Sequence, residues 1–185
     1  MLGAFFFIAM LVLGVNGWRS IAASNGRAAD ALAKVEALAD AADVARSAQV
    51  EFKVQVQEWK NILIRGSDPA DFKKYRDGFE KSAAGTLAEL DKLKTALAAQ
   101  GAATDKVGAA QAALRELNDR YHAALKSYDG ANPDSYRLLD QQVKGMDRAP
   151  TKQIDDIVDG IQDYAKTTMA AMRRDREAAE QAQKR

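Results

Sequence analysis

Three basic residues spaced seven apart are the first side chains of this sequence that could bind a ligand. Arg46, Lys53 and Lys60 follow one side of a helical pattern, next to its apolar positions. Cationic groups in such a place can bind an anion, and Gln57 and Asn61 add hydrogen-bonding groups within the same two turns. The stripe is also typical of a solvated flank whose aliphatic stems cover the core. Both interpretations are open.

Basic, amide and phenol side chains also gather near the ends of two later helical segments. They are Arg120, Tyr121, Tyr128, Tyr136, Arg137 and Gln141. Arginine offers a two-pronged donor to a carboxylate, and tyrosine adds a hydroxyl donor. Together with Lys53, Gln57, Lys60 and Asn61, we expect these residues to form a binding site for a small anionic ligand.

Motifs of enzymes and metal sites are absent from the sequence. It has no phosphate-binding loop, dinucleotide-binding glycine motif, HExxH zinc motif or GxSxG nucleophile motif. There is no cysteine and one histidine, His122, so the usual ligand sets of zinc, haem and di-metal bundles are missing. Basic and acidic residues balance, 27 against 26, which argues against a nucleic-acid partner. We expect a binding protein, not an enzyme, without metal or other cofactor.

Long helices are predicted to position these residues, because alanine is abundant and glycine and proline mark only a few breaks. The first helix should run from near residue 20 to Arg65, with a heptad seam of apolar residues. The seam consists of Val35, Leu38, Ala42, Ala45, Gln49, Phe52, Val56, Trp59 and Leu63. After it, Gly66 is expected to be left-handed, Asp68 to cap the second helix, and Pro69 to open it.

Glycine and proline residues predict the ends and starts of three more helices. We expect them at 69–100, closed by Gly101, at 104–128, and from Pro133 to the end. Pro150 predicts a kink or short break at 148–151 in the fourth helix. At 1.5 Å per residue, the first and fourth helices would each be roughly 70 Å long. The predicted fold is all-α, an antiparallel up-down-up-down four-helix bundle with long helices 1 and 4.

The first eighteen residues form an apolar stretch that ends at Trp18 and Arg19. About 15 apolar residues followed by an aromatic and a basic residue predict a truncated transmembrane helix over 1–18, with the bundle at 19–185. A cleaved signal peptide and a buried soluble helix are the alternatives. Val50, Val54 and Ile62 lie off the seam, and either widen the core face or form a contact surface for a homodimer.

Three stretches carry a family resemblance. Residues 55–66, followed by Asp68-Pro69, Phe72 and Tyr75, resemble the four-helix-bundle sensory domain of bacterial methyl-accepting chemotaxis proteins. Residues 117–128 and 143–151 resemble the same family. The junction of the first two helices is the most specific of these matches.

The resemblance implies a periplasmic ligand-binding domain anchored in the inner (cytoplasmic) membrane. It implies a homodimer that holds an amino acid or organic acid near the distal end of its interface. A piston-like shift of the fourth helix would carry the signal across the membrane to a kinase-controlling module absent from this chain. An arginine cluster of the aspartate-binding kind is not reproduced, which favours a di- or tricarboxylate over an amino acid. The sensor domain of a histidine kinase or cyclase, and a structural bundle without a ligand, are the alternative functions.

Overall fold

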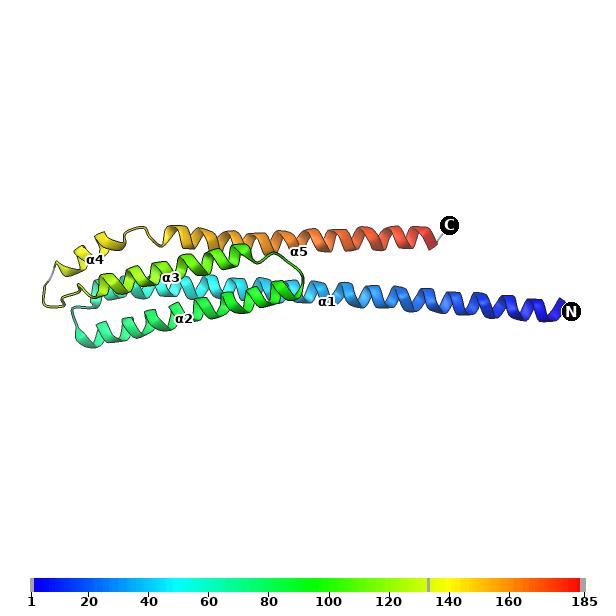
Figure 1. Ribbon diagram of the computed structural model, residues 1–185, viewed down its shortest axis with the longest axis horizontal. Helices are drawn as coiled ribbons and strands as arrows, with labels where there is room; N and C mark the ends of the chain where they lie inside the picture. The colour runs from blue at the N-terminus through cyan, green and yellow to red at the C-terminus, as the bar shows by residue number, and fades with distance from the viewer. Residues whose placement is uncertain (1, 133, 184–185) are drawn as a thin grey trace. The chain divides into compact units, whose positions relative to one another are not determined.

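The computed structural model describes the backbone of residues 2–132 and 134–183, and the side chains of residues 26, 29–132 and 134–182. These residues form five helices and no strand, so the all-α prediction is confirmed. The helices are α1 (Leu2–Arg65), α2 (Pro69–Ala99), α3 (Asp105–Leu125), α4 (Ser135–Val143) and α5 (Arg148–Gln183), as Figure 1 shows.

The chain divides into two compact units. One comprises Met1–Ala37 with Thr168–Arg185, and the other comprises Leu38–Thr167, which we call the core unit. No helix within the described part of the chain is both long and apolar enough to cross a membrane. The predicted transmembrane stretch, 1–18, is helical in its backbone from Leu2, and its side chains lie outside the described residues.

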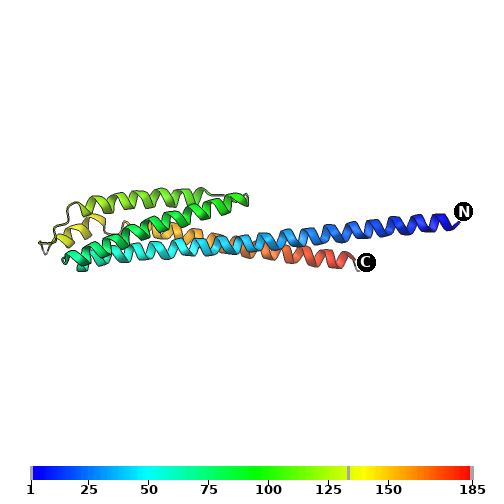
Figure 2. The same cartoon turned by 90° about the horizontal axis from the view of Figure 1, so that it is seen from below.

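Aromatic rings from three helices form the centre of the core unit. The ring of Trp59 on α1 packs against Tyr121 of α3, with ring centroids 4.3 Å apart and ring planes tilted by 30°. Phe79 of α2 meets Tyr121 edge-on at 5.5 Å. Such ring pairs add about 0.5–1.5 kcal/mol to the free energy gained from burying their area. Within the core unit, α1, α2 and α3 lie side by side in both ribbon views (Figures 1 and 2).

Polar contacts between helices show their relative directions. Glu80 and His122 pair near one end of α2 and α3, while Asp91 and Gln111 are joined by a hydrogen bond of 2.6 Å toward the other end. Residue numbers therefore rise on α2 as they fall on α3, which makes this helix pair antiparallel. The same holds for α1 and α2, because Glu58 lies over Gly78 and Glu51 lies over Gly85.

The junction of α1 and α2 follows the sequence prediction in one respect and departs from it in another. Asp68 is the N-cap of α2, and its Oδ1 accepts hydrogen bonds from the backbone of Ala70 at 2.8 Å and of Asp71 at 3.0 Å. The left-handed conformation predicted for Gly66 is wrong, since the described glycines with positive φ are Gly101 and Gly145.

Gly66 is needed for close packing instead. A Cβ atom placed there would meet the carbonyl oxygen of Ile62, the Oη of Tyr128 at 2.9 Å and the ring of Phe72 at 3.1 Å. The rings of Phe72 and Tyr128 are themselves stacked, with centroids 4.8 Å apart. The sequence pattern indicated a glycine requirement at this turn, but the reason for it is steric.

The end of α2 confirms the prediction that Gly101 closes this helix. Gly101 has φ +67°, and its backbone N–H donates to Ala98 at 3.0 Å while that of Ala102 donates to Leu97 at 2.9 Å. These two bonds define the Schellman motif, in which a left-handed residue satisfies the last carbonyls of a helix.

The predicted fourth helix is divided into α4 and α5. The break spans residues 144–147, before the predicted 148–151, and Gly145 adopts φ +76° within it. Pro150 lies in the first turn of α5, where backbone N–H groups have no partner within the helix, so its ring disturbs nothing. Gly145 therefore ends the helical path, and the proline follows the break. Pro133, the predicted start of this helix, lies outside the described residues.

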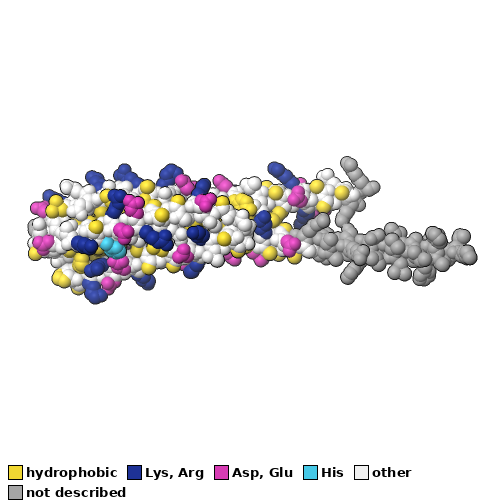
Figure 3. All heavy atoms as spheres, in the orientation of Figure 1, with side chains coloured by type: hydrophobic (Ala, Val, Ile, Leu, Met, Phe, Trp, Pro, Cys, Tyr) yellow, Lys and Arg dark blue, Asp and Glu magenta, His cyan; other side chains and the backbone are white. Residues whose placement is uncertain are grey.

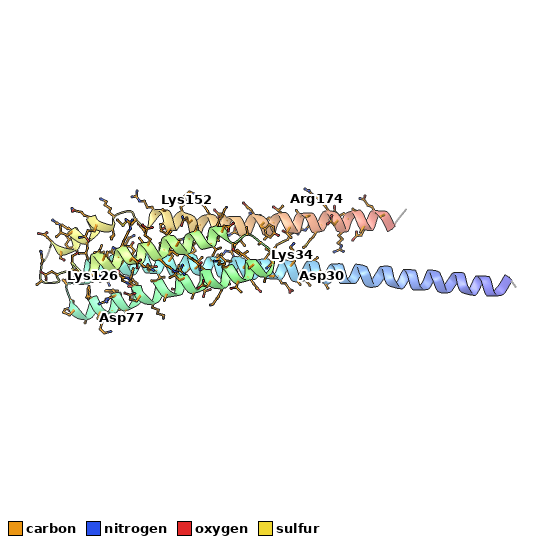
Figure 4. All side chains as sticks on the ribbon, in the orientation of Figure 1. Asp30, Lys34, Asp77, Lys126, Lys152 and Arg174 are labelled. Atoms are coloured by element: carbon orange, nitrogen blue, oxygen red, sulfur yellow. The ribbon has the colours of Figure 1, made fainter. Side chains whose placement is uncertain are left out.

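The three off-seam apolar residues of α1 differ in burial, and one of them widens the core face as predicted. Ile62 is fully buried and belongs to the core, whereas Val50 and Val54 are 57% and 40% exposed. Charged side chains of both signs are interspersed over the face that Figure 3 shows. Those labelled Asp77 and Lys152 lie at the outer edges of the helices in Figure 4.

Candidate functional site

An open groove of about 430 Å³ lies between the end of α1 and the short helix α4 in the core unit. We call it the α1–α4 groove. Its α1 wall is formed by Lys60, Leu63 and Ile64. The opposite wall is formed by Tyr136, Arg137, Asp140, Gln141 and Lys144.

The sequence of α4 explains why these side chains line the groove. Ser135, Leu139 and Val143 are buried, and this spacing of four residues places them on one face of the helix. The Oγ of Ser135 also accepts a hydrogen bond of 2.8 Å from the backbone N–H of Asp129, which fixes the start of the helix. The polar residues between the buried positions must then lie on the exposed side, where the groove is.

Positive charge dominates the groove, which has three cationic side chains and one carboxylate. The Nε of Arg137 donates to the Oη of Tyr136 at 3.0 Å, and its Nη1 lies 3.5 Å from Asp134. The Tyr136 hydrogen bond, followed by the charges of Tyr136 and Asp134, raises the pKa of Arg137, which stays cationic. Lys60 and Lys144 have no ion pair within 4.0 Å among the described side chains. Their ammonium groups are therefore available to a carboxylate.

Four of the residues predicted for the site meet at this groove: Lys60, Tyr136, Arg137 and Gln141. The other predicted residues of α1 lie outside its lining. Lys53 and Gln57 are exposed on the surface, and Asn61 is half-buried. Asn61 donates to Glu58 at 3.2 Å and accepts from Gln57 at 3.4 Å, so its amide already has partners.

The structure places the other three predicted residues in packing and surface contacts away from the groove lining. Arg120 pairs with Glu116 at 2.6 Å, and its Nη1 lies 3.9 Å from the Met146 sulfur. Tyr121 is buried against Trp59, and burial, with a smaller effect of Asp147, raises its pKa. Tyr128 is stacked on Phe72, and partial burial likewise raises its pKa, followed by the effect of Asp129. Aromatic packing accounts for both tyrosines.

Sequence reasoning missed two charged residues of the groove, Asp140 and Lys144. A signal for them existed, because 137, 141 and 144 share one helical face with 140. Asp140 is a carboxylate, which an anion site does not predict, and Lys144 lies inside the continuous fourth helix that the sequence predicted, away from its ends.

Comparison with known proteins relates the chain to a chemotaxis receptor. It is 33% identical over 121 residues to the methyl-accepting chemotaxis protein CtpH of Pseudomonas aeruginosa. The match covers 65% of this chain and 21% of that protein, so the chain corresponds to about a fifth of the length of this relative. No family model matches the sequence. No solved structure matches it either.

Proposed function

We propose that this chain is the extracytoplasmic sensory domain of a methyl-accepting chemotaxis receptor and binds a small anionic ligand in the α1–α4 groove. The main observation behind this proposal is the groove, which has a volume of about 430 Å³ and is lined by three cationic side chains and one carboxylate. A volume of this size suits a small molecule. The similarity to a methyl-accepting chemotaxis protein supports the receptor class. The domain acts by binding and has no catalytic role.

The proposed architecture is an up-down-up-down bundle at 19–185 that stands in the periplasm, anchored in the inner membrane by residues 1–18. The antiparallel pairs α1–α2 and α2–α3 support this topology. The fourth bundle helix is then α4 followed by α5. The signal consists of a population shift between two packings of this fourth helix, to which α4 contributes the groove residues. Output lies in receptor modules outside this chain.

A homodimer is part of the proposal, and a stripe on α1, exposed except at the half-buried Asn61, supports it. Val50, Val54, Gln57, Asn61 and Ile64 follow one another at steps of four, three, four and three residues. This is the spacing of a helix–helix seam. Among them, Ile64 is 75% exposed and also lines the groove. The dimer interface would therefore lie next to the ligand.

Binding measurements on the full chain test the proposal. A thermal-shift screen with di- and tricarboxylates and amino acids should give a ligand that raises the melting temperature. At 100 times its Kd, a ligand stabilises the fold by about 2.7 kcal/mol. At roughly 2–4 °C per kcal/mol, the expected shift is about 5–11 °C. If no compound of the screen produced a shift, direct sensing of small anions by this domain would be refuted.

Charge-removing variants then test the location of the site. Lys60→Ala and Arg137→Ala should each weaken the hit about tenfold or more in calorimetry, because a hydrogen bond to a charged group contributes about 1.5–3 kcal/mol. Lys53→Ala is the matched control, since Lys53 is a cation on the same helix outside the groove lining. Equal weakening by Lys53→Ala and Lys60→Ala would show a general effect of charge, and the groove would not be the site.

A further inference from the structure

The α1–α4 groove contains one carboxylate, Asp140, among its three cationic side chains. Its position in α4 would allow ion pairs with Arg137, one turn before it, and with Lys144, one turn after it. Neither pair forms, since Asp140 has no ion pair within 4.0 Å among the described side chains. The guanidinium of Arg137 instead turns toward Tyr136 and Asp134. The groove therefore has an unneutralised negative group on its α4 wall.

We infer that Asp140 determines ligand specificity, selecting a small acid that carries an ammonium group and disfavouring acids with further carboxylates. This inference rests on the proposed function of the groove. A ligand with both charges places its carboxylate at the cations and its ammonium group at Asp140. A di- or tricarboxylate of similar size brings like charge to Asp140, which costs free energy at short range. Specificity commonly depends on such a repulsive element as well as on attraction.

The inference reverses the preference for di- and tricarboxylates that the sequence suggested. That preference came from the absence of an aspartate-type arginine cluster, because α1 has Lys53 and Lys60 where arginine was expected. The structure leaves Lys53 outside the groove lining and adds Asp140 to it. A zwitterion presents its carboxylate to the cations and its ammonium group to Asp140, whereas a polycarboxylate offers Asp140 only like charge.

Pairs of acids that differ only at C2 test the inference. We would measure calorimetric Kd values for alanine and lactate, aspartate and malate, and glutamate and 2-hydroxyglutarate on the full chain. Each pair replaces an ammonium group by a hydroxyl at nearly constant shape. In wild type, at least one amino acid should bind about tenfold or more tightly than its hydroxy partner. Asp140→Asn should reduce that ratio to within about twofold, by weakening the amino acid and strengthening the hydroxy acid.

Asp119→Asn is the matched control, because Asp119 is an exposed carboxylate of α3 outside the groove lining, and the ratio should not change. If the hydroxy acids bound wild type as tightly as the amino acids, or if Asp140→Asn kept the ratio, the role of Asp140 would be refuted while the proposed function stood. A change of the same size in Asp119→Asn would also refute it, because the effect would then be one of net charge. If wild type bound neither these acids nor polycarboxylates, the proposed function and the inference would fail together.

Discussion

The junction of α1 and α2 at Gly66, which forms a tip of the core unit, offers a sharp test of the packing. One added methyl group has no space there. In Gly66→Ala, the new Cβ would meet the Ile62 carbonyl oxygen, which accepts the 2.8 Å hydrogen bond of residue 66 and has little freedom to move. It would also lie 2.9 Å from the Tyr128 Oη and 3.1 Å from the Phe72 ring. Overpacking costs about 1–3 kcal/mol. Disturbing the ring stack costs about 0.5–1.5 kcal/mol more, so the expected loss of unfolding free energy is about 2–4 kcal/mol.

Gly160→Ala provides the matched control, since the same methyl group added in α5 finds nothing within 4 Å. Only helix propensity then acts, and it should stabilise the protein by about 1 kcal/mol. Urea unfolding, followed by circular dichroism and by Trp59 fluorescence in a Trp18→Phe background, measures both changes. Gly66→Ala at wild-type stability would refute the tight tip. A destabilised Gly160→Ala would show that the surroundings of Gly160 are not open.

Two further predictions concern the cap of α2 and the buried phenol. Asp68→Ala should lower the unfolding free energy by about 1 kcal/mol in urea titrations. Asp68→Asn should lower it by clearly less, because asparagine is also a good N-cap. Equal losses in the two variants would argue against capping. Burial raises the pKa of Tyr121 above its ordinary value of 10.0, so the stability it contributes is fully present below about pH 10 and lost as the pH rises further. Tyr121→Phe should make the fall in unfolding free energy between pH 9 and 11 less steep, whereas Tyr164→Phe, at an exposed site, should not. If the fall in Tyr121→Phe were as steep as in wild type, Tyr121 would not be the group responsible.

The sequence was most informative at the ends of helices. Local signals determine where a helix begins or ends, because one or two side chains and a backbone conformation are sufficient. Examples are Asp68 with Pro69 at the start of α2, and Gly101 after Gln100 at its end. The heptad seam was only partly predicted. Phe52 and Trp59 are buried as expected, but the core face of α1 also includes Ala41, Ala48, Gln55 and Ile62. A helix that contacts several neighbours buries a wider face than a single heptad seam. Some of the additional buried positions hold alanine or a polar residue, and the spacing of large apolar residues does not predict them.

The break in the fourth helix shows the limits of reading proline alone. Pro150 is a strong signal, yet its effect depends on the position it takes within a turn, and in the first turn of a helix it is tolerated. Gly145 carried the actual break. Its left-handed conformation is one of several that glycine adopts easily, so the residue type alone did not distinguish it from the other glycines.

The sequence predicted which site residues are neighbours within one helix, but not which residues of different helices come together. Arg137 and Gln141 share one face of α4 because residues four apart in a helix are neighbours, and Tyr136 joins them through its hydrogen bond with Arg137. Their approach to Lys60 depends on the packing of α4, which no local pattern encodes. Tyr121 and Tyr128 have the chemistry of a binding site, but their rings contribute more by stacking in the core and at the tip.

The buried amide of Gln55 has a mechanical consequence. Its Nε2 donates to the half-buried Asn118 of α3 at 2.6 Å, and Gln55 itself is fully buried. Translating one helix along the other by a single residue, about 1.5 Å, would separate the two amides and leave the buried Gln55 amide without this bond. The bond therefore opposes a change in the register of α1 on α3. If a ligand shifts the fourth helix as proposed, the motion can occur between α4 and α5, where the ladder of backbone hydrogen bonds is interrupted.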